Sequence, residues 1–156
     1  MKRILFVCLG NICRSPMAEA IFNYKICEKG LSDAFESDSC GTANYHIGLS
    51  PDHRAIRNLL KNQVPVSHAA RQLTEADLDY FDLILAMDQS NFDHITRLPN
   101  AITHQHKIKL MRDYDPLETG EVPDPYYGGD EGFQEVFEIL DRSIEMMIKA
   151  HSQKFN

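Results

Sequence analysis

The chain has 156 residues, of which 43% are hydrophobic and 25% charged, and its formal net charge is −7. A chain of this length can bury roughly 70% of its unfolded surface around one core, so residues 1–156 are expected to form a single domain. The acidic balance argues against nucleic-acid binding, which usually needs a basic face. Without a signal-peptide pattern or an apolar stretch as long as a membrane span, we expect a cytoplasmic protein that binds no membrane and keeps its four cysteines reduced.

Apolar, β-prone runs alternate with helical patterns along the chain. Strands are predicted at residues 2–8, 35–41, 83–87 and 107–111. Helices are predicted at residues 15–29, 51–61, 89–98 and 131–150. The last helix carries an apolar stripe expected in the core, made of Phe133, Val136, Phe137, Leu140, Ile144 and Met147. The alternation predicts an α/β fold, with helices on both faces of a central four-stranded parallel sheet.

The segment between the first strand and the first helix carries the strongest chemical signal. Cys8 and Arg14 have five residues between them, and Pro16 opens the helix, where its missing N–H costs nothing. The backbone N–H groups at this helix N-terminus form an anion site, and the same field favours a thiolate. The planar fork of Arg14 can hold two phosphate oxygens. The residues predicted to bind phosphate are Leu9, Gly10, Asn11, Ile12, Cys13, Arg14 and Ser15.

The longest irregular stretch, residues 113–129, is rich in proline, glycine and acidic residues. Long irregular loops in compact domains are often functional. Displacing an oxygen leaving group from phosphorus is easier when an acid protonates that oxygen, so a carboxyl group is expected across the phosphate from Cys8. Asp124 and Asp115 each precede a proline and are the two candidates.

The segment Val7-Cys-Leu-Gly-Asn-Ile-Cys-Arg-Ser-Pro16 resembles the signature of the low-molecular-weight protein tyrosine phosphatases. Further matches cover nearly the whole chain in order; they are Gly41-Thr42, Tyr45-His46, Gly48, Pro51, Arg54-Ala55, His68, Arg71, Ala86-Met87-Asp88, Ser90-Asn91 and Asp124-Pro-Tyr-Tyr127. The resemblance implies a three-layer fold of flavodoxin-like topology and hydrolysis of phosphotyrosine without a metal or other cofactor.

By the match to the family's motifs, Cys8 is the nucleophile, Arg14 binds phosphate and Asp124 is the general acid and base. The family's general acid lies in the pattern Asp-Pro-Tyr/Trp-Tyr, which Asp115-Pro116-Leu117 lacks, so Asp115 is the second choice. A phosphocysteine intermediate is implied. Cys13 is expected to capture an oxidised Cys8 as a reversible disulfide.

The resemblance also implies roles around the nucleophile. Ser15 would hydrogen-bond the sulfur of Cys8, and Asn11 would brace the loop from a left-handed conformation. Glu19, Asp38 and His68 would form a supporting hydrogen-bond network. Aromatic faces would sandwich the phosphotyrosine ring, and they are supplied by Tyr45, His46, Tyr126 and Tyr127. Tyr45 stands where the family more commonly has tryptophan.

Three alternatives compete with phosphotyrosine hydrolysis. Protein-arginine phosphatases resemble this loop but have threonine at the position of Ile12. Thioredoxin-coupled arsenate reductases need a further cysteine pair, which residues 83–110 lack. A phosphotyrosine-binding module would lack Cys8 or Asp124. The expected partners are phosphotyrosine-containing proteins, among them an autophosphorylated tyrosine kinase, and the protein is expected to be a monomer or a weak dimer.

Overall fold

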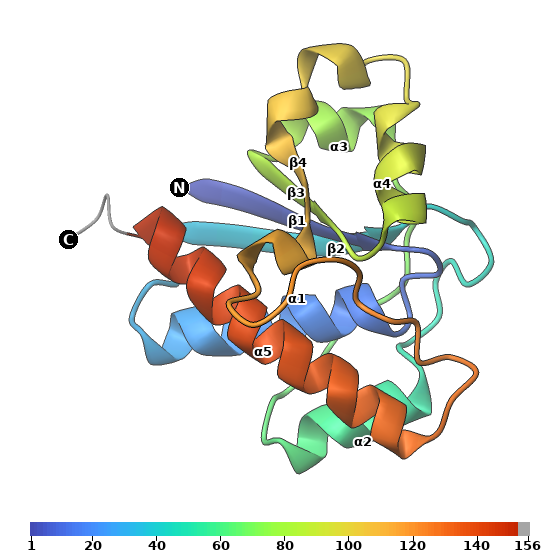
Figure 1. Ribbon diagram of the computed structural model, residues 1–156, viewed down its shortest axis with the longest axis vertical. Coiled ribbons are helices and arrows are strands. Elements are labelled where there is room, and N and C mark those ends of the chain that lie inside the picture. The colour runs from blue at the N-terminus through green and yellow to red at the C-terminus, as the bar shows by residue number, and fades with distance from the viewer. Residues whose placement is uncertain (153–156) are drawn as a thin grey trace.

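A computed structural model describes residues 1–152, which form a three-layer arrangement around one parallel sheet (Figure 1). The sheet has four strands in the order β2-β1-β3-β4, and all pairs are parallel. The strands are β1 (Lys2–Cys8), β2 (Phe35–Gly41), β3 (Leu83–Ala86) and β4 (Ile108–Leu110). The predicted α/β fold with a four-stranded parallel sheet is therefore confirmed, although β3 and β4 are shorter than expected.

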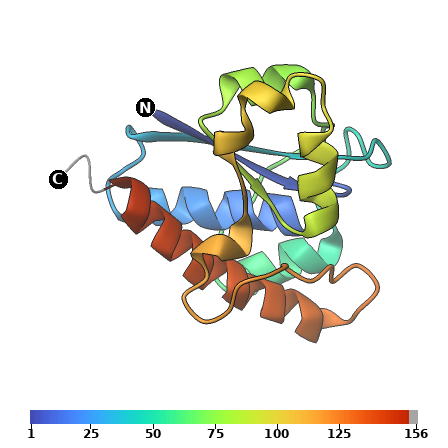
Figure 2. The ribbon, with the colours of Figure 1, turned by 45° about the horizontal axis from the view of Figure 1, so that its top comes forward.

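Helices cover both faces of the sheet, as the two views show (Figures 1 and 2). One side holds α1 (Arg14–Glu28), α2 (His53–Lys61) and α5 (Asp130–Ser152). The other side holds α3 (Glu75–Tyr80) and α4 (Gln89–Thr96). Short 3-10 helices lie at Ala101–Thr103, Gln105–Lys107 and Met111–Tyr114. No helix within residues 1–152 is long and apolar enough to cross a membrane.

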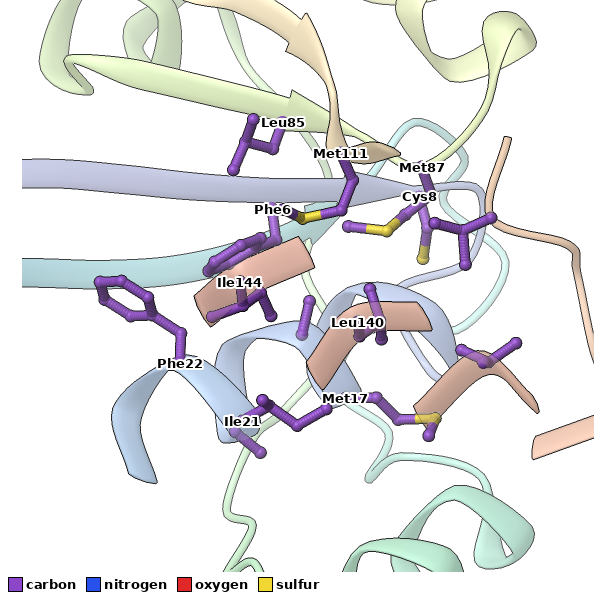
Figure 3. Packing of buried hydrophobic residues seen from close by; sticks show 14 of the residues in the cluster. Phe6, Cys8, Met17, Ile21, Phe22, Leu85, Met87, Met111, Leu140 and Ile144 are labelled. Atoms are coloured by element: carbon purple, nitrogen blue, oxygen red, sulfur yellow. The ribbon is translucent and has the colours of Figure 1, made fainter. Parts of the chain in front are cut away.

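The alternation of side chains along β1 builds a core on each face of the sheet. Phe6 and Cys8 face the helices α1 and α5, whereas Leu5 and Val7 belong to the cluster on the opposite face. Figure 3 shows Phe6 and Cys8 of the sheet against Phe22 of α1 and Leu140 of α5. The predicted stripe of α5 is buried along its whole length, so its assignment to the core is confirmed. Each such side chain contributes about 1.5–3 kcal/mol by leaving water.

The structure corrects the helix predictions in two places. The helix predicted from residue 51 begins at His53, because Asp52 is its N-cap and accepts a hydrogen bond from the backbone N–H of Arg54 at 2.8 Å. The helix α3 was not predicted. Its six residues are too few to show a helical period in the sequence. The helix is stabilised at its N-terminus by a capping box, in which Asp77 accepts a hydrogen bond from the backbone N–H of Thr74 at 2.8 Å.

Candidate active site

The loop that carries Cys8 and Arg14 lies at the carboxyl ends of β1 and β2. We call residues 8–15 the phosphate loop. Its backbone is tied to the end of β2, since the N–H of Thr42 donates to the carbonyl of Cys8 and the N–H of Ala43 to that of Leu9, both at 2.9 Å. Gly41 is the partner of Cys8 across the sheet. The parallel strands thus deliver the loop to the edge where α1 begins.

Asn11 shapes the phosphate loop from within. It adopts a left-handed conformation with φ of 58°, as the sequence led us to expect, and it is fully buried. Its Nδ2 donates to the hydroxyls of Ser15 at 2.8 Å and Ser39 at 3.0 Å. Its Oδ1 accepts from the backbone N–H of Arg71 at 3.0 Å and lies 2.7 Å from Nε2 of His68. The amide therefore fixes the turn with both of its polar atoms.

Arg14 is buried at the start of α1 and held from two sides. One Nη donates to Asp88 at 2.7 Å and to the carbonyl of Val122 at 3.0 Å. The other Nη lies 3.6 Å from the carboxylate of Asp124. Burial disfavours its charge, but the negative charge of Cys8 and the bond to Asp88 raise the pKa of Arg14 above its usual value. Asp88 belongs to the family match at Ala86-Met87-Asp88, but nothing in the sequence pairs it with Arg14.

Of the two acid candidates, only Asp124 lines the same pocket as Cys8. Its Oδ1 accepts from the backbone N–H of Tyr126 at 3.0 Å, and its side chain is 39% exposed. Asp115 is instead fully buried between Arg112 and Arg142, at 2.9 and 2.8 Å. Burial opposes its ionisation, yet its bonds to Arg142, the N–H of Leu117 and Arg112 lower the pKa of Asp115 to about 2. The alternative hypothesis, that Asp115 is the general acid, is therefore wrong.

The pocket has a volume of about 260 Å³ and is walled by aromatic rings. His46 lies between Tyr45 and Tyr126, with ring centroids 6.3 and 6.4 Å away. A Cβ at Gly10 would lie 2.9 Å from the ring of His46, so glycine lets that ring close against the phosphate loop. The residues that line the pocket are Cys8, Leu9, Gly10, Ile12, Cys13, Arg14, Tyr45, His46, Asp124, Tyr126 and Tyr127.

Residues predicted to support the loop lie behind it. Glu19 accepts from the hydroxyl of Ser39 at 2.7 Å and lies 3.2 Å from Nδ1 of His68. Asp38 differs from the expectation because its carboxylate accepts from Arg71 at 2.8 Å. Glu19, Asp38 and His68 have atoms of the kind that bind metal ions, and these atoms lie within 4.8 Å of one another. Each of the three side chains is already hydrogen-bonded within the protein, so the group supports the phosphate loop. Ser39 could not be identified from the sequence, because a single serine forms no motif.

Cys13 adds a second thiol to the pocket wall. Burial raises the pKa of Cys13 far above its usual value, and the charge of Asp52 acts in the same direction. The Cys13 thiol therefore stays protonated at neutral pH.

Comparison with known proteins agrees with this geometry. The family model for the low molecular weight phosphotyrosine protein phosphatases matches residues 3–155. The human protein of that name is 42% identical over 152 residues, which are 96% of each chain.

Two solved structures extend the comparison. A protein tyrosine phosphatase of Entamoeba histolytica is 37% identical, with a TM-score of 0.93 and full coverage of both chains. A Drosophila arginine phosphatase is 31% identical, with a TM-score of 0.87 over 98% of this chain and 99% of its own. The match over nearly the whole chain shows that this enzyme belongs to the low-molecular-weight phosphotyrosine protein phosphatase family.

Proposed function

We propose that the protein hydrolyses phosphotyrosine in other proteins through a phosphocysteine intermediate. The observation that carries the proposal is one aromatic-walled pocket that brings together Cys8, Arg14 and Asp124. A nucleophile, a buried cation and a carboxyl group are the three groups that displacement at a phosphate monoester requires.

The reaction proceeds in two displacements. The thiolate of Cys8 attacks phosphorus and an S–P bond forms while the bond from phosphorus to the tyrosyl oxygen breaks. Asp124 gives its proton to that oxygen. A water molecule then attacks phosphorus and loses a proton to Asp124, and the S–P bond breaks to release phosphate. Arg14 and the N–H groups of the phosphate loop stabilise the equatorial oxygens in both steps.

The aromatic walls favour an aryl phosphate as the substrate. Tyr45, His46 and Tyr126 offer ring faces at the pocket, and Ile12 supplies an apolar contact. Phosphoarginine is the second candidate, because the Drosophila arginine phosphatase is similar along nearly the whole chain. The apolar side chain of Ile12, in the place of the arginine phosphatases' threonine, supports phosphotyrosine over phosphoarginine.

The remaining expectations follow from this function. The substrates would include an autophosphorylated tyrosine kinase, and the enzyme would act in the cytoplasm as a monomer or a weak dimer. Cys13 lines the pocket beside Cys8, which supports its capture of an oxidised Cys8 as a disulfide.

The test is phosphate release from a phosphotyrosine peptide in the presence of a chelator, with the Cys8→Ser variant beside the wild type. Chelator-resistant release that disappears in the variant is the expected result. Release that persists in folded Cys8→Ser enzyme would refute the mechanism. A matched phosphoarginine peptide tests the substrate, and faster release from it would refute the phosphotyrosine assignment.

A further inference from the structure

Arg54, the second residue of α2, joins two segments of the active site that are distant in sequence. We call residues 123–129 the acid loop, because they carry Asp124. The guanidinium of Arg54 donates to the carbonyl of Tyr126 at 2.8 Å and to that of Gly128 at 2.9 Å. The N–H of Tyr126 in turn donates to the carboxylate of Asp124 at 3.0 Å, so holding Tyr126 in place also holds the carboxyl group of Asp124.

The other side of the guanidinium is tied to the phosphate loop through Asp52. Arg54 donates to the two carboxylate oxygens of Asp52 at 3.0 and 3.1 Å. The backbone N–H of Asp52 donates to the carbonyl of Ile12 at 2.8 Å. The bond from Arg54 holds the pKa of Asp52 below its usual value, so this partner stays ionised. A continuous path of hydrogen bonds therefore runs from Ile12 through Asp52 and Arg54 to Tyr126.

The chain is anchored just before the acid loop, since the N–H of Val122 donates to the carbonyl of Met87 at 2.8 Å and its carbonyl accepts from Arg14 at 3.0 Å. Within residues 1–152, the two bonds from Arg54 are the hydrogen bonds that join residues 123–129 to a part of the chain distant in sequence. The ion pair between Arg14 and Asp124, at 3.6 Å, is a longer contact. The guanidinium carbon also lies 4.8 Å from the ring centre of Phe133 and 5.6 Å from that of Tyr126, which limits its movement.

We infer that Arg54 is a positioning residue for the proposed general acid, fixing Asp124 across the pocket from Cys8 by holding the acid loop to the phosphate loop. The inference rests on the proposed function, in which Asp124 protonates the leaving oxygen. A lysine at this position would keep the charge but not the planar fork that reaches Asp52 and both carbonyls.

The experiment compares kcat/KM for phenyl phosphate, whose leaving group needs a proton, with that for p-nitrophenyl phosphate, whose leaving group needs it much less. Arg54→Met is expected to lose about tenfold or more on phenyl phosphate and less than about threefold on the nitrophenyl ester. Inhibition by inorganic phosphate should change by less than about threefold, because the phosphate loop remains in place. Arg54→Lys should lose an intermediate amount on phenyl phosphate.

Arg57→Met is the matched control. Arg57 lies on the same helix and pairs with Asp130 at 2.8 Å, but both side chains are more than half exposed. Such a surface pair contributes little, so less than about a twofold change on either substrate is expected.

A double-mutant cycle with Asp124→Ala decides whether Arg54 acts through Asp124. In the Asp124→Ala background, Arg54→Met should cost less than about a further twofold on phenyl phosphate. The inference is refuted if Arg54→Met causes its full loss of kcat/KM on phenyl phosphate even in the Asp124→Ala background. It is also refuted if Arg54→Met loses equally on phenyl and p-nitrophenyl phosphate, or if it keeps full activity. If a thermal melt shows that Arg54→Met is unfolded, Arg54→Lys replaces it in the double-mutant cycle with Asp124→Ala. A wild type without Cys8-dependent activity would instead refute the proposed function itself.

Discussion

The hydroxyl of Ser15 lies 2.9 Å from the sulfur of Cys8, with both side chains buried beneath the phosphate loop. The same Oγ accepts a hydrogen bond from Nδ2 of Asn11 at 2.8 Å. A thiolate at Cys8 can only accept, and at 2.9 Å the sulfur is nearer to the hydroxyl of Ser15 than its other acceptor, the carbonyl of Cys40 at 3.4 Å, so the hydroxyl is placed to donate to the sulfur. The loop therefore supplies Cys8, the proposed nucleophile, with a hydroxyl that is itself held in place by Asn11.

Removing that donor should slow the reaction without unfolding the protein. Ser15→Ala is expected to lower kcat about 10- to 100-fold, because a hydrogen bond to a charged group is worth roughly 1.5–3 kcal/mol. Alkylation of Cys8 by iodoacetamide at pH 6 should slow as well. Ser37→Ala, which removes a hydroxyl bonded to Asn23, is the control. Unchanged alkylation in Ser15→Ala would show that the hydroxyl does not stabilise the thiolate.

Asp124 should matter in proportion to the basicity of the leaving group. Asp124→Ala is expected to reduce kcat/KM for aryl phosphates with poor leaving groups about 100-fold or more, since a general acid contributes roughly 10²–10⁴. The loss on esters with good leaving groups should be much smaller. In a series of substituted phenyl phosphates, kcat/KM of Asp124→Ala should therefore depend more steeply on the basicity of the leaving group than kcat/KM of the wild type. An equal loss across the series would mean that Asp124 is not the acid.

Gly41 should be required for the shape of the phosphate loop. A Cβ at this position would lie 2.7 Å from the carbonyl oxygen of Leu9 and 3.1 Å from the backbone nitrogen of Asn11. Because these are backbone atoms, the loop must move to admit it. Gly41→Ala is expected to raise the inhibition constant of inorganic phosphate about tenfold or more, or 1.4 kcal/mol. In Gly132→Ala the new Cβ comes no nearer than 3.8 Å to another group, so that variant is the control. Equal phosphate affinity in the two variants would contradict this prediction.

The reacting groups that we propose could be selected from the sequence because they are concentrated in two short motifs. Cys8 and Arg14 share one loop, and Asp124 lies beside its two tyrosines. The fold was predictable for a related reason, since the alternation of strands and long helices persists along the chain. The shortest α-helix of the described residues, α3, was not predicted, because six residues barely exceed one turn and a half.

Contacts across the fold could not be predicted in the same way. Asp88 is 74 residues from its partner Arg14, and Arg54 is 72 residues from Tyr126. Neither pair has a local pattern, because the sheet and helices alone bring the partners together. Asp115 shows the converse, since a local Asp-Pro motif suggested catalysis while Arg142, 27 residues away, makes it a structural ion pair.

That ion pair predicts an acid-dependent loss of stability. The folded state holds the pKa of Asp115 at about 2, below the ordinary value of 3.8. A lowered pKa stabilises the folded state above the unfolded pKa, and this contribution disappears as the pH falls from about 4 to about 2. Since one pKa unit is worth about 1.4 kcal/mol, the contribution at neutral pH is roughly 2–3 kcal/mol.

Asp115→Asn should therefore lower the free energy of unfolding by roughly 2–3 kcal/mol at pH 7, as measured by urea denaturation. The difference from the wild type should shrink as the pH falls below about 4, because Asp115 of the unfolded wild-type chain then takes up a proton, whereas the folded state, with its lower pKa, stays charged down to about pH 2. Asp33→Asn, at an exposed position, is the control and should match the wild type throughout. If the difference in the free energy of unfolding between Asp115→Asn and the wild type stays constant from pH 7 to pH 2.5, then packing, and not the charge of Asp115, holds α5 to the segment around Asp115.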